Sequence, residues 1–260
     1  MVKKYKSLSI QLTIFLSVVV VYWWVIKGTD FSIPMFINGF PFMVDFLRRM
    51  FPPDLAILGK TIKAAAETVQ IAILGTSLAV FFAFPIGFLA AENMTHKPVI
   101  YAIFRTVANI CRGVSELVWA LLFVSMVGLG PFPGVLALMI HSIGALSKFF
   151  SEALENIQTE TILSLRATGA SRIQVIFQGI IPEVLPHFIT YIIYYLEHNI
   201  RAATVLGIVG AGGIGFELLT SIKLFKYREV LVIILVMLVL VTIVDQLSSL
   251  LRKRIIGEQK

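Results

Sequence analysis

The segment from Gly210 to Gly215 reads Gly-Ala-Gly-Gly-Ile-Gly and fits the pattern G-x-G-x-x-G, which in soluble enzymes holds the pyrophosphate of a dinucleotide. That chemistry needs a strand before the glycines and a helix after them, within a unit of about 30 residues. A long apolar run precedes Gly210 instead, and the sequence shows no alternation of strands and helices. A P-loop is excluded as well, because Phe216 and Glu217 occupy the positions of its Lys and Ser/Thr. We therefore predict that this chain binds no nucleotide.

The glycines instead follow the end of an apolar run, which gives them a different meaning. Irregular backbone at membrane depth persists only against other protein or beside a water-filled cavity. The segment therefore indicates a close-packed helix junction or a wall of a passage, and a flexible loop among the lipid headgroups is the alternative. The glycines concerned are Gly207, Gly210, Gly212, Gly213 and Gly215.

Ionisable side chains inside the long apolar runs are the second group that could do chemistry. Each is costly in hydrocarbon and therefore tends to face a passage or a partner. Arg105, Arg112 and Glu116 lie at i, i+7 and i+11, which predicts one shared helical face. Arg112 and Glu116 are also an i,i+4 pair and can neutralise each other.

Two further apolar runs carry ionisable residues. Glu197 and Arg201 repeat the i,i+4 spacing with His198 beside them, which indicates either a self-neutralising pair or a passage lining. His141 is alone in its run, and we expect it to make a hydrogen bond between helices rather than to bind substrate. Lys148, seven residues later, can extend to the interface. The candidates for the translocation pathway are Arg112, Glu116, His141, Glu197, Arg201, Gly210, Gly212 and Gly213.

The remaining composition predicts no catalytic and no metal site. Cys111 is the single cysteine and has no metal-ligand spacing around it. An integral-membrane enzyme would need a convergent Ser/His or His/Asp/Glu set, which the sequence does not offer. The net charge of +7 is interpreted as membrane orientation and headgroup contact, not as nucleic-acid binding.

The elements that position these residues are membrane spans. Of the 260 residues 58% are hydrophobic and 14% are charged, against about 25% charged residues in an ordinary soluble domain. A hydrocarbon core about 30 Å thick needs about 20 apolar residues in a helix. We therefore predict an all-α integral membrane protein with six transmembrane helices. The spans cover about residues 8–26, 68–91, 106–127, 133–150, 186–209 and 230–251.

Residues 1–63 are expected to form an anchor helix and an extracytoplasmic interfacial helix, ahead of a transmembrane domain over residues 64–255. The first span has the charged start of a signal peptide but no small-x-small cleavage site, so we predict an uncleaved anchor. Residues 41–54, PFMVDFLRRMFPPD, divide apolar and charged side chains between two faces, typical of an interfacial helix or an ordinary amphipathic loop helix. Six spans and basic ends place both termini in the cytoplasm.

A polar segment over about residues 151–182 separates the fourth and fifth spans and is cytoplasmic in this topology. Thr161 to Thr168 can form a short helix, Gly169 can end it in the left-handed conformation, and Ser171 can cap the next helix. Two short helices joined by a glycine turn predict a rigid projection that docks into a groove on another protein. The apolar face of the second helix carries Ile173, Ile176 and Phe177.

This segment resembles the EAA loop of ABC importer permeases, whose pattern is E-A-A-x3-G-x9-I-x-L-P. Gly169 and Pro182 lie at the spacing of the pattern. The other positions depart from it, with Leu163, Ser164 and Leu165 in place of Glu and two alanines, Gly179 in place of Ile, and Ile181 in place of Leu. The resemblance implies that the ATPase-coupling residues are Leu163, Ser164, Leu165, Arg166, Ala167, Thr168, Gly169, Ala170 and Ser171.

The elements GLGPF, SKFFSEA and RATGAS are similar to the phosphonate branch of these permeases, and the likeness covers most of residues 64 to 255. It implies a permease homodimer in the bacterial inner membrane, two separate ATP-binding cassette subunits that bind ATP and Mg²⁺, and an extracytoplasmic phosphonate-binding protein. This chain would then bind no cofactor itself, and the glycine segment would lie near the dimer axis. Phosphite, hypophosphite, another small anion or an amino-acid-like solute are alternative cargoes, and an ATP-independent channel or secondary carrier is the alternative class.

Overall fold

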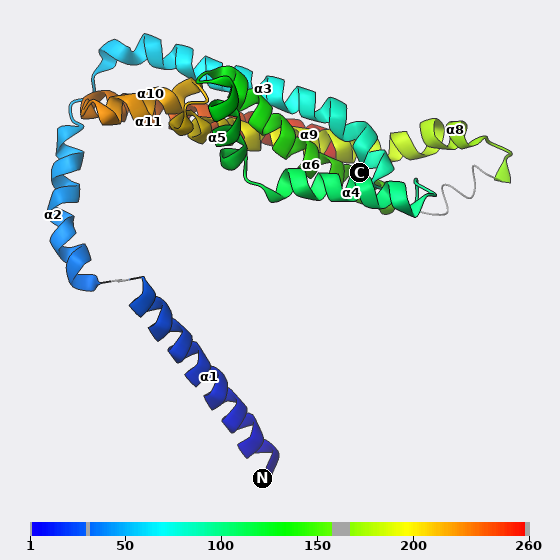
Figure 1. The fold of residues 1–260 in the computed structure, drawn as a ribbon, viewed down its shortest axis with the longest axis horizontal. Coiled ribbons are helices and arrows are strands. Elements are labelled where there is room, and N and C mark those ends of the chain that lie inside the picture. Colours follow the sequence, from blue (N-terminus) through cyan, green and yellow to red (C-terminus); the bar gives the residue numbers. More distant parts are fainter. Residues whose placement is uncertain (1, 30–31, 158–166, 258–260) are drawn as a thin grey trace. The chain divides into compact units, whose positions relative to one another are not determined.

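The computed structural model describes residues 2–29, 32–157 and 167–257, and the chain divides into two units, Met1–Phe51 and Pro52–Lys260. In the first unit α1 covers Val2–Gly28 and α2 covers Ile33–Arg49 (Figure 1). Ser32 caps α2 by accepting a hydrogen bond from Met35 N. The predicted boundary at residue 63 falls inside the first long helix of the second unit.

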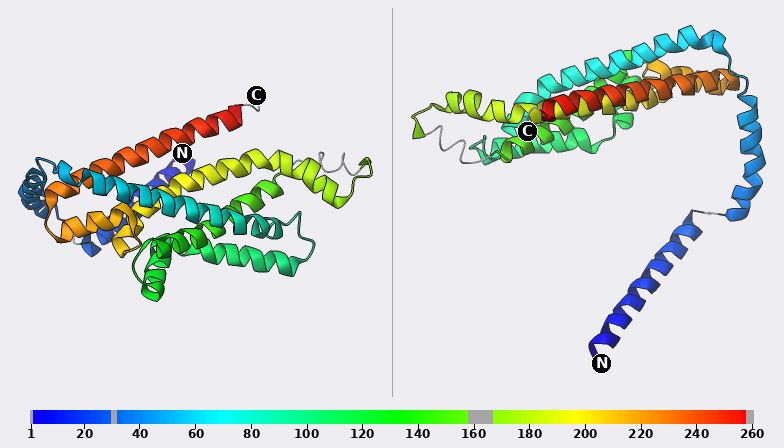
Figure 2. Two further views of the ribbon diagram at one scale, coloured as in Figure 1. Left: turned by 90° about the horizontal axis from the view of Figure 1, so that it is seen from above. Right: turned by 180° about the vertical axis from the view of Figure 1, so that it is seen from behind.

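The second unit is a bundle of long and short helices (Figure 2). A π-helical turn, Ile176–Ile180, joins α8 directly to α9, so the predicted second helix of the polar segment continues into the fifth span. Leu163, Ser164, Leu165 and Arg166 lie outside the described residues. The helices are α3 (Leu58–Leu89), α4 (Pro98–Gly113), α5 (Glu116–Val127), α6 (Pro131–Glu155), α8 (Arg172–Val175), α9 (Ile181–Leu206), α10 (Gly213–Lys223) and α11 (Tyr227–Gly257).

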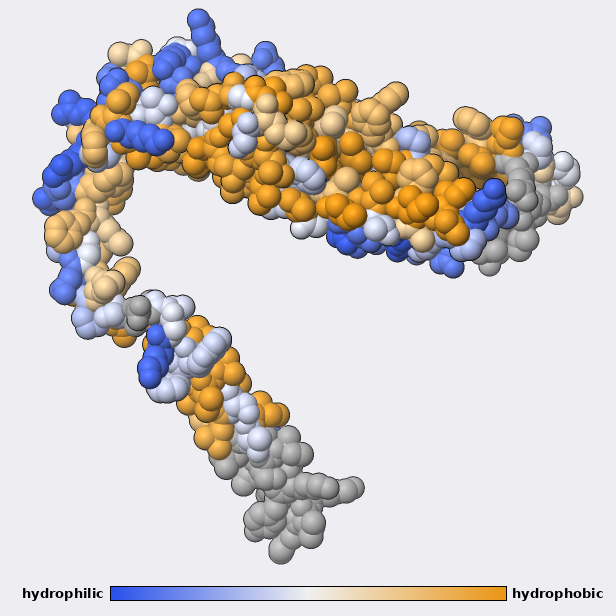
Figure 3. All heavy atoms as spheres, in the orientation of Figure 1, coloured by the Kyte–Doolittle hydropathy of each residue, from blue (hydrophilic) through white to orange (hydrophobic). Residues whose placement is uncertain are grey.

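The described helices fit an all-α membrane protein. Four helical stretches are long and apolar enough to cross a membrane, and up to six spans result if each of two bent helix pairs counts as one. Apolar side chains cover most of the visible flank of the bundle, and hydrophilic ones gather at its ends and along part of its lower edge (Figure 3). The predicted fold class is therefore confirmed, with six spans at the upper end of this range.

The third predicted span is broken. α4 ends at Gly113, and α5 begins at Glu116 after a bend of 85°, so α5 crosses the direction of α4 (Figure 2). The prediction that Arg105, Arg112 and Glu116 share one helical face is therefore wrong. The helix that would align all three ends between Arg112 and Glu116.

Side chains stabilise the backbone at this break. Ser115 caps α5 by accepting from Leu117 N at 3.2 Å. Trp119 Nε1 donates to Cys111 O at 3.2 Å, and His141 Nδ1 lies 3.1 Å from Val114 O. Because irregular backbone in a membrane needs its polar groups satisfied by protein, these contacts allow the chain to turn there.

α6 lies at the centre of the bundle and contacts α3, α4, α5 and α9. Small residues permit this close packing, as is usual between membrane helices. A Cβ added to Gly144 of α6 would lie 2.5 Å from Ala108 O of α4, so the two backbones touch. Gly75 of α3 meets α6 similarly, with a Cβ position 3.0 Å from Leu138 Cβ.

A buried polar network ties α3, α6 and α9 together. Asn199 is fully buried, its Nδ2 donates to Thr76 Oγ1 at 2.9 Å, and the same atom lies 2.8 Å from Ser142 Oγ. Since buried polar groups are costly without partners, this three-residue contact fixes how the three helices are rotated relative to one another.

We expect Asn199→Leu to destabilise the bundle by about 1–3 kcal/mol, because Ser142 and Thr76 lose a buried partner. Thermal unfolding of the detergent-solubilised chain measures the change. Thr242→Val is the control, because Thr242 is exposed and its hydroxyl donates to Leu238 O of its own helix. An Asn199→Leu chain that unfolds at the wild-type temperature would contradict the role of the network.

Candidate translocation and coupling sites

A cleft between α4 and α6 carries the strongest positive charge of the candidate sites. Its volume is about 210 Å³. Arg105 pairs with Glu155 at 3.0 Å and Lys148 pairs with Glu152 at 3.3 Å, so two of its three cations are already compensated. The lining residues are Ala90, Arg105, Ala108, Asn109, Arg112, Lys148 and Ser151.

Arg112 is the uncompensated cation of this cleft. Its Nε donates to Asn109 Oδ1 at 3.2 Å, and no carboxylate pairs with it among the described residues. The expected Arg112–Glu116 pair is therefore wrong, since the break between α4 and α5 separates the two side chains. A guanidinium with free donors in a polar cleft can bind an oxyanion through two parallel hydrogen bonds.

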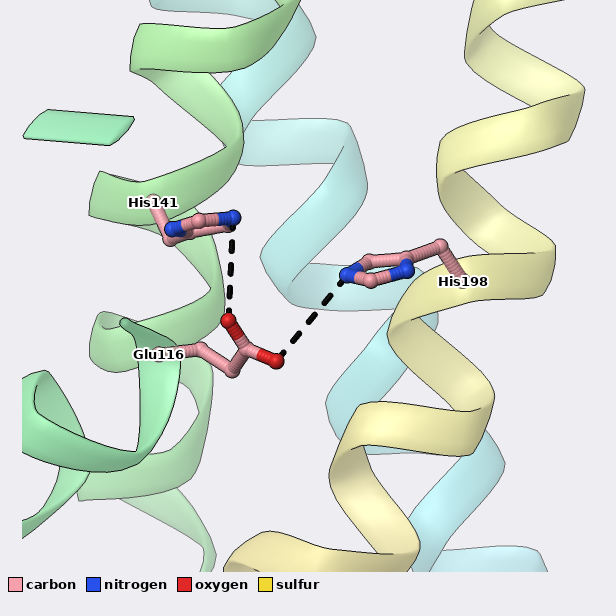
Figure 4. Close-up of side chains that lie close together, drawn as sticks. All are labelled: Glu116, His141 and His198. Atoms are coloured by element: carbon pink, nitrogen blue, oxygen red, sulfur yellow. Dashed lines mark ion pairs between the residues drawn. The ribbon is translucent and has the colours of Figure 1, made fainter. Parts of the chain in front are cut away.

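Glu116 instead meets two histidines from other helices (Figure 4). Its Oε2 lies 3.6 Å from His141 Nε2 and its Oε1 lies 4.0 Å from His198 Nε2. The expected interhelical hydrogen bond of His141 is confirmed by its contact with Val114 O. His141 is not alone, however, because α5, α6 and α9 bring three titratable groups to one place.

Glu197 and Arg201 belong to a larger ion-pair network between α9 and α11. Their i,i+4 pair is confirmed, with Arg201 Nη2 2.7 Å from Glu197 Oε1. Arg252 Nη2 lies 3.1 Å from the other carboxylate oxygen of the buried Glu197, and Arg201 Nη1 lies 3.3 Å from Asp245 Oδ1. This arrangement holds α9 against α11, and a place on the passage stays a prediction for both residues.

The glycine segment forms a close-packed junction between the end of α9 and the start of α10. Gly210, Gly212 and Gly213 have φ values of 90°, 78° and 70°, which residues with a Cβ rarely adopt. Gly210 O accepts from Gly130 N at 2.9 Å, which joins the junction to the start of α6. The interpretation of this segment as a close-packed helix junction is therefore confirmed, and its place on the wall of a passage stays a prediction.

Two residues of α3 that sequence reasoning missed hold the start of α10. Gly213 N donates to Glu67 Oε1 at 3.2 Å, and Ile214 N donates to Thr68 Oγ1 at 2.8 Å. The first turn of a helix exposes backbone N–H groups and favours a negative charge. The Glu67 carboxylate supplies both the hydrogen-bond acceptor and the negative charge. It lies 146 residues away in the sequence, so no local pattern could have indicated it.

The described part of the polar segment has the predicted turn and cap. Gly169 has a φ of 82°, Ser171 Oγ accepts from Gln174 N at 3.4 Å, and Gln174 Oε1 accepts from Ser171 N at 2.8 Å. This reciprocal pair is a capping box. Within and just after this box, Ile173 and Phe177 are 69% and 65% exposed. A stiff helix end thus presents apolar side chains outside the bundle.

A helical bundle with ionisable groups between its spans and a capped projection at one end fits the class of membrane-spanning transport subunits. Residues 83–257 match the protein family described as binding-protein-dependent transport system inner membrane component. The match covers more than half of the sequence, so the chain belongs to this family.

Curated relatives include permeases of phosphite and phosphonate transport systems. The chain is 40% identical over 243 residues to the phosphite transport system permease protein PtxC of Stutzerimonas stutzeri, covering 94% of this chain and 88% of that protein. It is 38% identical to the phosphate-import permease protein PhnE of Mycolicibacterium smegmatis, covering 86% of this chain and 42% of that protein.

The fold is that of a type I ABC importer permease. A structure of the MetNI methionine ABC transporter in an inward-facing conformation superposes with a TM-score of 0.66 at 18% identity, covering 78% of this chain and 99% of that chain. An amino acid ABC transporter solved with histidines gives a TM-score of 0.64 at 16% identity, covering 77% of this chain and 98% of that chain.

Proposed function

We propose that this chain is the permease of an ATP-driven importer for a phosphorus oxyanion of the phosphonate or phosphite kind. The observation that carries the cargo proposal is the basic cleft between α4 and α6, in which Arg112 has no carboxylate partner among the described residues. The relatives named for phosphite and phosphonate transport support the same class of cargo.

The balance of charge in this cleft favours weak, reversible binding of an oxyanion over tight binding. A small oxyanion makes charge-assisted hydrogen bonds with a guanidinium and is held more tightly as more free cations surround it. Arg105 and Lys148 already pair with Glu155 and Glu152, which leaves Arg112 to attract the anion. Binding is then weak enough for release, and tight selection belongs to the extracytoplasmic phosphonate-binding protein.

The permease works as two copies with a separate pair of ATP-binding cassette subunits, which bind ATP and Mg²⁺. Asn109 and Arg112 are exposed on α4, and such groups avoid lipid. They therefore face the second copy or the water-filled passage between the copies. Both termini lie in the cytoplasm. The polar segment, which contacts the ATPase, lies on the same side of the membrane.

Coupling follows from the rigidity of that segment. Closure of the ATPase dimer on nucleotide draws the two segments together, and because α8 is continuous with α9, the spans move with them. The passage then opens outward, and hydrolysis reverses the motion. Nucleotide drives this exchange through its different affinity for the two states.

Uptake of radiolabelled phosphite and methylphosphonate into proteoliposomes containing the assembled transporter tests the proposal. We expect Arg112→Gln to lower uptake about 10- to 100-fold, because a hydrogen bond to a charged group contributes about 1.5–3 kcal/mol. Arg49→Gln is the control, since Arg49 is exposed and pairs with Asp45 in the first unit.

The possible results separate the cargo from the transport class. Uptake of methionine, with no uptake of phosphite or methylphosphonate, would refute the proposal that the cargo is a phosphorus oxyanion. Equal oxyanion uptake with and without ATP would refute the ATP-driven class in favour of a channel or secondary carrier.

A further inference from the structure

Glu116, His141 and His198 offer three metal-binding atoms from three different helices. One carboxylate oxygen and one ring nitrogen from each histidine lie within 4.8 Å of one another. Glu116 begins α5, His141 lies in the middle of α6 and His198 lies in α9, and all three side chains point to a common centre (Figure 4). Transition metals of the zinc type prefer this combination of imidazole and carboxylate ligands.

The hydrogen bonds around the cluster leave the inward-facing atoms available. His141 Nδ1 lies 3.1 Å from Val114 O, and because a carbonyl only accepts, Nδ1 carries the hydrogen. In the neutral ring Nε2 then presents its lone pair towards Glu116. An imidazole oriented by a backbone carbonyl through its other nitrogen is the usual arrangement of a metal-ligating histidine.

His198 contributes the second inward-facing ring nitrogen of the cluster. Its Nε2 is buried, has no such partner among the described residues, and lies 4.0 Å from Glu116 Oε1. The rings of His141 and His198 are nearly parallel, with centroids 6.3 Å apart and an interplanar angle of 26°. With the His198 hydrogen on Nδ1, three electron-pair donors face one another, an arrangement that a cation between them would stabilise.

The spacing of the donors matches a metal site after a small contraction. Ligands bound tetrahedrally to zinc at about 2.0–2.1 Å lie about 3.3 Å apart. The 3.6 and 4.0 Å distances to the two histidines involve different oxygens of Glu116. The three ligand atoms lie within 4.8 Å of one another, so metal binding would draw them together by up to about 1.5 Å. The three side chains are 15–38% exposed, which gives an ion a route of entry.

The sequence predicted no metal site, but the fold brings Glu116, His141 and His198 together from three helices. We propose that these three residues bind one divalent transition-metal ion of the Zn²⁺ type, with the fourth coordination position open to water or an anion. The bound ion neutralises the Glu116 carboxylate inside the span. It also links α5, α6 and α9, and the last two flank the polar segment that we expect to contact the ATPase. Metal binding therefore restrains the helices whose relative movement opens the passage.

The purified full-length chain, freed of metal with a chelator, is titrated with Co²⁺ while its visible d–d absorption is recorded, and Zn²⁺ is then added in competition. We expect a tetrahedral Co²⁺ spectrum that saturates at one ion per chain and is displaced by Zn²⁺. His141→Ala and His198→Ala each weaken Zn²⁺ binding by at least about tenfold.

The chain contains its own matched control, because His96 and His187 lie outside the cluster. The double variant His96→Ala/His187→Ala keeps the full Co²⁺ signal if the proposal is correct. A native chain with no tetrahedral Co²⁺ spectrum would overturn the proposal, as would a spectrum that is lost in the His96/His187 variant but kept in the His141 and His198 variants. Failure of oxyanion uptake would not affect either result.

Discussion

Gly169→Pro is expected to abolish ATP-driven uptake while the chain still inserts and folds. Gly169 has a φ of 82°, whereas the proline ring fixes φ near about −65°. The substitution therefore redirects the chain immediately before the capping box of Ser171 and Gln174. Ile173 and Phe177, which follow that cap, would no longer meet the ATPase at the same angle. Among the described residues no heavy atom lies within 4 Å of an added Cβ at Gly169, so the described bundle is not disturbed.

The expected result is a loss of uptake of at least about tenfold together with ATP hydrolysis that no longer responds to cargo-loaded binding protein. Proteoliposome uptake and phosphate release from ATP measure the two quantities. Gly169→Asn is the matched control, because asparagine adopts the left-handed conformation more readily than other residues with a Cβ. Gly169→Ala should lie between the two, since that conformation costs such a residue about 1–2 kcal/mol. Full uptake by the proline variant would remove the polar segment from the coupling mechanism.

Much of this local structure was predictable because its causes lie within a few residues. The turn at Gly169 and the cap at Ser171 follow from adjacent residue types, and the long apolar runs predict α3, α6, α9 and α11. The break between α4 and α5 was also signalled, by Gly113 at a helix end and Ser115 at a helix start. The apolar run across it predicted one continuous span, and the contacts that stabilise the break come from Trp119 and His141.

The candidate sites were less predictable because periodicity orients residues on one helix but does not rotate one helix against another. The i,i+4 pair of Glu197 and Arg201 was visible in the sequence, whereas Arg252 and Asp245 joined it only through the packing of α9 against α11. Glu116 meets His141 because α5 turns by 85° from α4. A tertiary contact of this kind depends on the whole bundle.

The glycine junction leads to the second large prediction, which concerns stability. A Cβ added to Gly215 would collide with Thr204 O and lie 3.1 Å from Gly207 Cα, so backbone atoms are the obstacle. Backbone cannot move aside as a flexible side chain does. We expect Gly215→Ala to separate α10 from the end of α9 and to cost about 1–3 kcal/mol, the usual range for overpacking. Thermal unfolding in detergent and the steady-state amount of protein in membranes measure this loss.

Gly59→Ala provides a control for which the expected change in stability is zero or favourable. Gly59 lies in α3, and no heavy atom in the described part of the chain lies within 4 Å of its Cβ position. Alanine is favoured over glycine in a helix by about 0.5–1 kcal/mol, so this variant should be as stable as the wild type or more stable. The same added methyl group therefore destabilises one position and not the other, because only at Gly215 do two backbones already touch. Equal unfolding temperatures for the two variants would show that the junction opens at little cost, and the glycines would then serve flexibility rather than close packing.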